Sequence, residues 1–281
     1  MDIAYVTVKN VTRNALLTTI ERFYDAVPRA SAAAEEHGGL TLFVQRGAGW
    51  PLYARPALGG PPPTEADVLA VRARQRELGV PEAFEWLDEV SPELASVASA
   101  AGLAVARHPL MVLDTFAAAE VPAGAELRFL DPDDAQLADD LAMLTAVARV
   151  GFSSPGTASG PAGAAERDAG MTAFPDADVA AARSALRSGR LARAIVSDGS
   201  GPVCVGTYQR AGNVVEVVGV ATLPSARRRG LAAAVTSALT RHALDHGAEV
   251  VFLSAGDEDV ARLYARIGYR PLATACIAEP R

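Results

Sequence analysis

The sequence contains 281 residues, half of them hydrophobic, with 33 acidic and 26 basic side chains and a net charge of −7. This length is about twice that of an average domain, so two domains are expected. A negative net charge argues against nucleic-acid binding, which depends on a positive surface. The two cysteines, Cys204 and Cys276, are too few for a disulfide framework and are expected to be reduced and buried.

No membrane segment or export signal is expected. No apolar run approaches the roughly 20 residues of a membrane-spanning helix, and the N-terminus lacks the layout of a secretory signal. We therefore expect a cytoplasmic protein that does not bind membranes.

The first expected domain covers residues 1–114 and alternates helices with short strands. The predicted elements are a helix ending at Pro28, a strand at 40–45, a turn at 47–49, a hairpin partner at 50–58, a helix from Thr64 to Leu78, a strand at 84–87, a helix at 91–101 and a strand at 110–114. Residues 115–125 are small and include Pro and Gly, as expected of an interdomain linker.

The second expected domain covers residues 126–281. Its predicted elements are strands at 127–130, 192–197, 202–210, 214–221, 250–254 and 269–278, and helices ending near Val150, Ser188, Gly247 and Gly268. Between the first two helices, residues 153–176 show no periodicity. A loop of this length is typical of a lid, a substrate loop or a disordered segment.

One stretch of the second domain predicts an anion site. The strand 214–221 is rich in β-branched residues and is followed by Pro224, which cannot continue a sheet ladder. Three arginines, 227–229, then lead through Gly230 into a helix that begins at Leu231. A glycine and a helix N-terminus together expose backbone N–H groups, which favours a pyrophosphate. The alternative is an ordinary strand–turn–helix with a solvated basic loop.

The motif Arg227-x-x-Gly230-x-Ala232 resembles the acyl-CoA signature Q/R-x-x-G-x-G/A of the GNAT (Gcn5-related) N-acetyltransferases. Residues 257–269, DEDVARLYARIGY, are similar to the family segment N-x-x-A-x-x-L-Y-x-x-x-G-F. The predicted element order over 126–281 is also similar to a complete GNAT domain. The resemblance implies an α/β (α+β) acyl-CoA N-acyltransferase fold, with a mixed, mostly antiparallel sheet flanked by helices, in two tandem domains.

The first half of the chain is similar to the second. When Gly102 is set against Gly268 without gaps, apolar pairs match, among them Trp86 with Phe252. The first half lacks the arginines, has Glu65 at the corresponding helix start and has Ala98 where Tyr264 stands. A carboxylate at a helix N-terminus disfavours phosphate, so we interpret residues 1–114 as a degenerate, non-catalytic GNAT-like domain.

The resemblance implies which residues bind acetyl-CoA. The N–H groups of the turn and helix start would hold the pyrophosphate, with the arginines adding positive charge. The strand before the turn would splay from its neighbour and pair with the pantetheine arm and the thioester, unless it is a plain buried strand. The candidates are Val220, Ala221, Thr222, Arg227, Arg228, Arg229, Gly230, Leu231, Ala232, Asp257 and Tyr264.

Glu216 is the candidate general base. It is the only charged residue in the apolar run 214–222, where burial would raise the pKa of a carboxyl group. It also stands 14 residues before Gly230, as the strand glutamate does in some family members. The alternative is a glutamate at the pocket rim that binds the substrate's ammonium without taking its proton.

Tyr264 is the candidate general acid, because the resemblance places its phenol at the coenzyme sulfur. The alternative is a tyrosine that packs its helix on the sheet. Asp257 replaces the usual Asn of the motif, and it accepts hydrogen bonds from the coenzyme or caps the helix.

A metal site is not expected. His242 and His246 have helical i, i+4 spacing, but no third ligand accompanies them, and we interpret them as structural.

The sequence thus predicts an acetyl-CoA-dependent N-acetyltransferase that acts by direct attack of a primary amine in a ternary complex. Alternatives are a non-catalytic acyl-CoA-binding regulatory module and an N-terminal domain that presents a protein partner. The acceptor is expected to be a small-molecule or peptide amine. The sequence leaves three points open: the identity of the acceptor, whether the acyl group is acetyl or longer, and the oligomeric state.

Overall fold

The computed structural model describes residues 11–46 and 53–281, which fall into two compact units. Among these residues, unit 1 is Met111–Arg270, and unit 2 is Val11–Leu110 together with Pro271–Arg281. The turn predicted at 47–49 and the start of its hairpin partner lie outside the described residues.

Unit 1 contains strands β10, β9, β8, β7 and β6, which are neighbours in this order at one end of an eight-stranded sheet, β4-β11-β5-β10-β9-β8-β7-β6. Strands β9 and β10 are parallel, and the other neighbours are antiparallel, which confirms the expected mixed, mostly antiparallel sheet. The elements are β6 Glu126–Phe129, α4 Leu137–Phe152, α5 Ala164–Ala169, α6 Asp176–Arg187, β7 Leu191–Asp198, β8 Gly201–Ala211, β9 Val214–Thr222, η1 Pro224–Ala226, α7 Leu231–Asp245, β10 Val250–Ser254, α8 Glu258–Ala265 and β11 Tyr269–Pro280. Helix α5 lies inside the stretch 153–176, which we predicted to be irregular.

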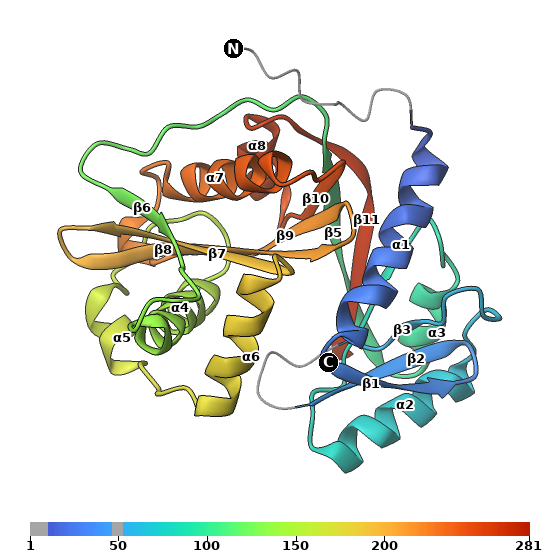
Figure 1. The fold of residues 1–281 in the computed structure, drawn as a ribbon. Coiled ribbons are helices and arrows are strands. Elements are labelled where there is room, and N and C mark those ends of the chain that lie inside the picture. The colour runs from blue at the N-terminus through green and yellow to red at the C-terminus, as the bar shows by residue number, and fades with distance from the viewer. Residues whose placement is uncertain (1–10, 47–52) are drawn as a thin grey trace. The chain divides into compact units, whose positions relative to one another are not determined.

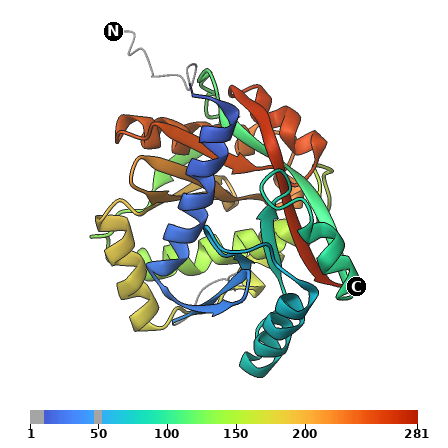
Figure 2. The same cartoon turned by 90° about the vertical axis from the view of Figure 1, so that its right-hand side faces the viewer.

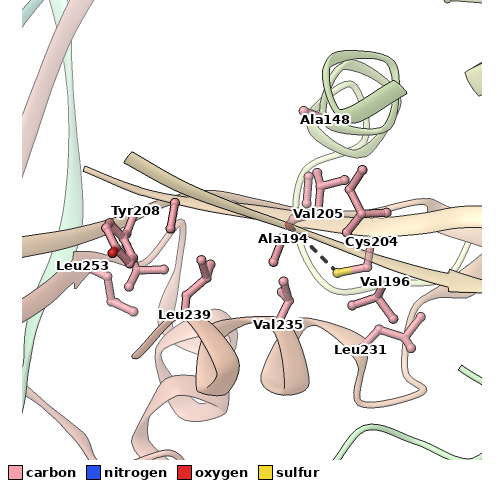
Figure 3. Packing of buried hydrophobic residues seen from close by; sticks show 14 of the residues in the cluster. Ala148, Ala194, Val196, Cys204, Val205, Tyr208, Leu231, Val235, Leu239 and Leu253 are labelled. Atoms are coloured by element: carbon pink, nitrogen blue, oxygen red, sulfur yellow. Dashed lines mark hydrogen bonds between the residues drawn. The ribbon is translucent and has the colours of Figure 1, made fainter. Parts of the chain in front are cut away.

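Helices cover both faces of this sheet. Helix α4 contacts β8 and β9 from one side, and α7 contacts the same strands from the other (Figure 1). Figure 3 shows Leu231, Val235 and Leu239 of α7 pointing toward the sheet, with Ala148 of α4 on the opposite side. Helix α7 packs closely on β8 at Gly206, where an added Cβ would lie 2.8 Å from Cδ1 of Leu239.

Strand β9 contains an extra residue and separates early from β10. The pairs Val205↔Ala221 and Thr207↔Val218 leave two residues of β9 opposite one of β8, which defines a β-bulge. Gly219, at the bulge, has a φ of 63°. The pairing of β9 with β10 ends at Glu216↔Phe252. Among residues 11–46 and 53–281, the rest of β9 therefore pairs with β8 and with no second strand.

Unit 2 contains a three-stranded antiparallel sheet, β1-β2-β3, with α1 and α2 on its two sides (Figures 1 and 2). Burial of four successive residues of β2, from Leu40, agrees with cover on both faces. The elements are α1 Arg13–Arg29, β1 Ala32–His37, β2 Leu40–Gln45, β3 Arg55–Pro56, α2 Glu65–Leu78, β4 Phe84–Leu87, α3 Leu94–Ala100 and β5 Leu103–Leu113.

Three details of unit 2 differ from prediction. Strand β1 was not predicted, because its sequence AAAEEH lacks the β-branched residues that mark a strand, and pairing with β2 overrides this weak propensity. Strand β5 begins at Leu103 instead of Leu110. Pro28 lies within α1, which continues to Arg29.

The two units share a run of elements in the same order, which in unit 1 follows β6, α4 and α5. In unit 2, α1-β1-β2-β3-α2-β4-α3 precedes β5, and in unit 1, α6-β7-β8-β9-α7-β10-α8 precedes β11. This repeat supports the interpretation of the first half as a degenerate copy of the second.

The last strand of the chain serves both hydrophobic cores. Tyr269 is buried in the core of unit 1, whereas Cys276 and Ala278 are buried with Trp86 in the core of unit 2, where β11 pairs with β4. The units therefore do not end where the expected domains 1–114 and 126–281 end. Both cysteines are free and buried, as expected.

Candidate active site

The turn after β9 has a backbone conformation suited to an anion. Arg228 has a φ of 65°, and Gly230 has a φ of 82°. Arg228 is the only described residue other than glycine with a positive φ, a conformation that costs free energy and is concentrated at functional sites. Alternating backbone conformations of this kind aim successive N–H groups into one concavity, which binds anions.

The helix that follows the turn has an open N-terminus. No side chain caps α7 at Gly230, its first turn has no acidic residue, and its first helical bond runs from the N–H of Ala234 to the carbonyl of Gly230. The three N–H groups before Ala234 are thus oriented outward along the helix axis, where they and the helix dipole favour a negative group.

The corresponding helix of unit 2 is closed. In α2, Thr64 and Asp67 form a reciprocal capping box, and Glu65 adds a second carboxylate to the first turn. Such a terminus has its own internal acceptors and repels phosphate.

The three arginines of the turn have different environments. The guanidinium of Arg227 donates to the carbonyl oxygens of Gly151 at 2.7 Å, Ser154 at 2.6 Å, Ala158 at 3.0 Å and Thr222 at 3.3 Å. Burial lowers its pKa. Its side chain therefore holds the loop after α4 against the end of β9, a contact for which the sequence carried no signal.

Arg229 is paired, and Arg228 is free. Arg229 forms an ion pair of 2.6 Å with Asp198, at the end of β7. Burial alone would raise the pKa of Asp198, but hydrogen bonds from Arg229 and Ser200 lower it to about 2. Arg228 is exposed and has no hydrogen-bond or ion-pair partner among the described residues, so its charge is available to a ligand.

The loop 153–163 lies along this turn. The N–H of Gly160 donates to the carbonyl of Pro224 at 3.1 Å, and the N–H of Ser225 donates to the carbonyl of Ala162 at 3.0 Å. A Cβ on Gly156 would lie 3.9 Å from a carboxylate oxygen of Asp257. The segment predicted to be a lid or substrate loop thus reaches from the turn to the start of α8.

The predicted thioester strand lies beyond the last β9–β10 pair. Ala221 is buried, whereas Val220 and Thr222 are partly exposed. The side chain of Thr222 donates to Sγ of Cys204 at 3.2 Å, which orients it toward β8. Among the described residues, β10 does not pair with this segment, and the carbonyl of Thr222 accepts from Nε of Arg227 at 3.3 Å.

Glu216 occupies the last paired position before β9 and β10 separate. It stands opposite Gln209 in β8 and Phe252 in β10, and only 8% of its surface is exposed. A carboxylate is rarely buried to this degree unless it is paired or has a functional role.

Asp257 and Tyr264 both belong to the α8 segment, at its N-cap and near its end. Tyr264 is 6% exposed, and burial raises the pKa of its phenol, which therefore keeps its proton at neutral pH. Asp257 is the N-cap, and its carboxylate accepts from the N–H of Val260 at 2.8 Å. The structure thus shows the helix-capping role of Asp257, whereas its coenzyme contact stays a prediction.

The two histidines of α7 have structural contacts. His242 lies 3.0 Å from the hydroxyl of Tyr208 and stacks on Phe129 and His246. Burial lowers the pKa of His242. Among residues 11–46 and 53–281, no group of three His, Cys, Asp or Glu side chains could hold a metal ion.

Comparison with solved structures defines the fold class. A GCN5-related N-acetyltransferase from Kribbella flavida has a TM-score of 0.67 at 23% identity, over 95% of this chain and 96% of that one. A GCN5-related N-acetyltransferase-like protein from Streptococcus suis 89/1591 has a TM-score of 0.55 at 11% identity, over 96% and 100%. A tandem GNAT protein from the clavulanic acid biosynthesis pathway has a TM-score of 0.51 at 15% identity, over 85% and 77%. The chain thus has the acyl-CoA N-acyltransferase fold in a two-domain arrangement.

The family model described as "Acetyltransferase (GNAT) family" matches residues 175–269. This segment, which contains the turn, Glu216 and Tyr264, is a GNAT-family domain. No curated protein matches the chain. In the part of the chain that the structure describes, no helix has the length and apolar character needed to cross a membrane.

Proposed function

We propose that the protein is an N-acetyltransferase that transfers the acetyl group of acetyl-CoA to a primary amine by direct attack in a ternary complex. The observation that carries this proposal is the combination of an uncapped helix α7 with a strand β9 that leaves β10 after Glu216. Together they would provide a pyrophosphate site and, next to it, a strand edge for the pantetheine arm that no strand among the described residues pairs with.

The residues around the turn fit the coenzyme. The N–H groups of the segment 228–232 would bind the pyrophosphate, and Arg228 would add an unpaired positive charge. The backbone of Val220–Thr222 would pair with the pantetheine arm and polarise the thioester carbonyl. Arg227 contributes through its hydrogen bonds to the loop after α4, and Arg229 contributes through its ion pair with Asp198. Both contacts would stabilise the conformation of the turn.

The reaction needs one proton acceptor and one proton donor. In the proposal, the carboxylate of Glu216 takes a proton from the acceptor's ammonium, and the neutral amine attacks the thioester carbon. The new C–N bond forms, the C–S bond breaks and the phenol of Tyr264 gives a proton to the departing thiolate. The products are the acetylated amine and coenzyme A.

Unit 2 has a supporting role in this proposal, because its corresponding helix is closed by the capping box of Thr64 and Asp67.

The second candidate function, a non-catalytic acyl-CoA-binding module, uses the same turn. It gives no reason for a carboxylate buried at Glu216, which favours the enzyme.

Two measurements test the proposal. Acetyl-CoA should raise the melting temperature, and Gly230→Asp should abolish that rise, because its carboxylate would face the pyrophosphate. Gly212→Asp is the matched control, since Gly212 also has a positive φ, of 60°, and nothing lies within 4 Å of an added Cβ. A panel of primary amines should then release coenzyme A. Stabilisation without release from any amine would favour the binding module, and an equal effect of both variants would refute the assignment of the turn.

A further inference from the structure

The register of the sheet assigns side chains to its two faces. Opposite residues of paired strands project to the same face, so Ile195, Val205 and Ala221 share one face. This face, which we call the α4 face, is covered by α4, because a Cβ on Gly151 would lie 3.0 Å from the Cβ of Ala221. Figure 3 shows Val205 on the side of Ala148 and Ala194 on the side of Val235.

Beyond the cover of α4, the same face carries polar residues together with Leu191 and Val218, and α6 contacts β7. By the same register, Arg193 is opposite Thr207, and Gln209 is opposite Glu216. Arg193, Thr207 and Gln209 are partly exposed, whereas the alternate residues on the α7 side are buried: Ala192, Ala194, Tyr208, Val215 and Val217. This end of the α4 face is thus a partly open polar surface with Glu216 at its border.

Arg193 is the unusual member of this surface. Its Nε is buried and has no hydrogen-bond partner, and Arg193 has no ion pair with any described residue. Burial lowers its pKa, and no carboxylate among the described residues opposes the effect. Neighbouring arginines are paired, Arg128 with Asp140 and Arg229 with Asp198. A partly buried guanidinium without a counter-charge lowers the stability of the fold. A ligand that supplied the missing negative group would account for its presence here.

The position of Arg193 fits an acceptor that has two charged ends. Arg193 and Glu216 are separated by two strand spacings and by two residues along the strand. With about 4.8 Å between strands and about 3.3 Å per residue, their Cα atoms are roughly 12 Å apart, and their side chains bridge much of that distance. We propose that Arg193 binds a carboxylate of the acceptor, so that the substrates are amines that also carry a carboxylate group. This inference rests on the proposed function.

The guanidinium geometry specifies the expected ligand. Its planar donors match a carboxylate in a two-point hydrogen bond, which a lysine ammonium does not reproduce. We therefore expect Arg193→Met to abolish the preference for carboxylated amines and Arg193→Lys to restore it only in part. Because the guanidinium has no hydrogen-bond or ion-pair partner in the part of the chain that the structure describes, neither substitution should lower the melting temperature.

The test compares matched amine pairs: γ-aminobutyrate with γ-aminobutyramide, lysine with lysinamide, and glycine with glycinamide. For at least one pair, kcat/KM for coenzyme A release should be about 10- to 100-fold higher for the acid than for the amide, as a charge-assisted hydrogen bond provides. Arg193→Met should remove this ratio mainly through KM of the acid and leave the amide nearly unchanged. Arg190→Met, which alters an exposed arginine just before β7, is the control and should keep the ratio.

A second measurement does not depend on turnover. The same acids, but not their amides, should raise the melting temperature of the wild-type protein, and Arg193→Met should abolish that rise. If the wild-type protein acetylated acids and amides equally well, this inference alone would be overturned. The same would follow if Arg193→Met lowered the activity toward acids and amides equally. No turnover of any amine, with acid-specific stabilisation retained, would overturn the proposed function alone. Absence of both the rate preference and the stabilisation would overturn the inference.

Discussion

The guanidinium of Arg227 donates to the carbonyl oxygen of Ser154 at 2.6 Å, although the two residues are 73 positions apart in the sequence. This contact, together with those to Gly151 and Ala158, joins the loop after α4 to the turn before α7. Arg227, the first arginine of the acyl-CoA signature, therefore fixes the loop next to the turn, whereas the charge of Arg228 is available to a ligand.

Substitution of these two arginines should separate stability from coenzyme binding. Arg227→Ala leaves carbonyl oxygens without their donor and should lower the free energy of unfolding by about 2–4 kcal/mol. Arg228→Gly removes the free charge and relieves the positive φ, so it should weaken acetyl-CoA binding without loss of stability. Urea denaturation and calorimetric titration measure the two effects. Equal losses of stability would contradict the distinction.

The ion pair of Asp198 with Arg229 should make the free energy of unfolding fall in acid. Its folded pKa of about 2 lies below the unfolded value of about 3.9, so the ion pair with Arg229 stabilises the fold above pH 4. That contribution is lost as the pH falls from about 4 toward 2. Solvent screening limits it to about 1 kcal/mol.

Asp198→Asn should remove this contribution, so its free energy of unfolding should approach that of the wild type near pH 2. Urea denaturation at a series of pH values measures the difference. If the difference in free energy of unfolding between the two proteins stayed constant from about pH 4 to 2, Asp198 would not be the source of the pH dependence.

Tyr264→Phe should lower kcat for acetyl transfer much more than the affinity for acetyl-CoA, because the phenol acts on the leaving thiolate. Tyr269→Phe is the matched control. Its hydroxyl is bonded to Thr240 at 2.7 Å, so its removal should cost about 1 kcal/mol of stability and little activity. If Tyr264→Phe instead behaved as this control does, Tyr264 would be a packing residue.

Glu216→Gln should remove the acidic limb of the pH profile of kcat/KM, because the amide has no proton to exchange near neutral pH. Steady-state rates across the pH range, with melting temperatures measured in parallel, test this role. An acidic limb that persists at the same pH would assign the base to another group and leave Glu216 as an ammonium-binding residue.

The strand–turn–helix around Gly230 could be predicted because its signals are local. The apolar run of β9, the stop at Pro224 and the helical spacing after Leu231 are adjacent in the sequence, and they produce the elements observed. The same is true of the N-cap at Asp257 and the helix start at Thr64. Each depends on residues within about one helical turn of each other.

The sequence alone thus determined the family resemblance, the mixed sheet and the contiguous residues of the turn. Only the tertiary structure decided that Arg227 binds the loop at Ser154, that β11 ends in the core of unit 2, and that Arg193 shares a sheet face with Glu216. The physical reason is distance along the chain. Hydrogen-bond partners, strand register and burial of this kind join segments tens of residues apart, and only packing brings them together.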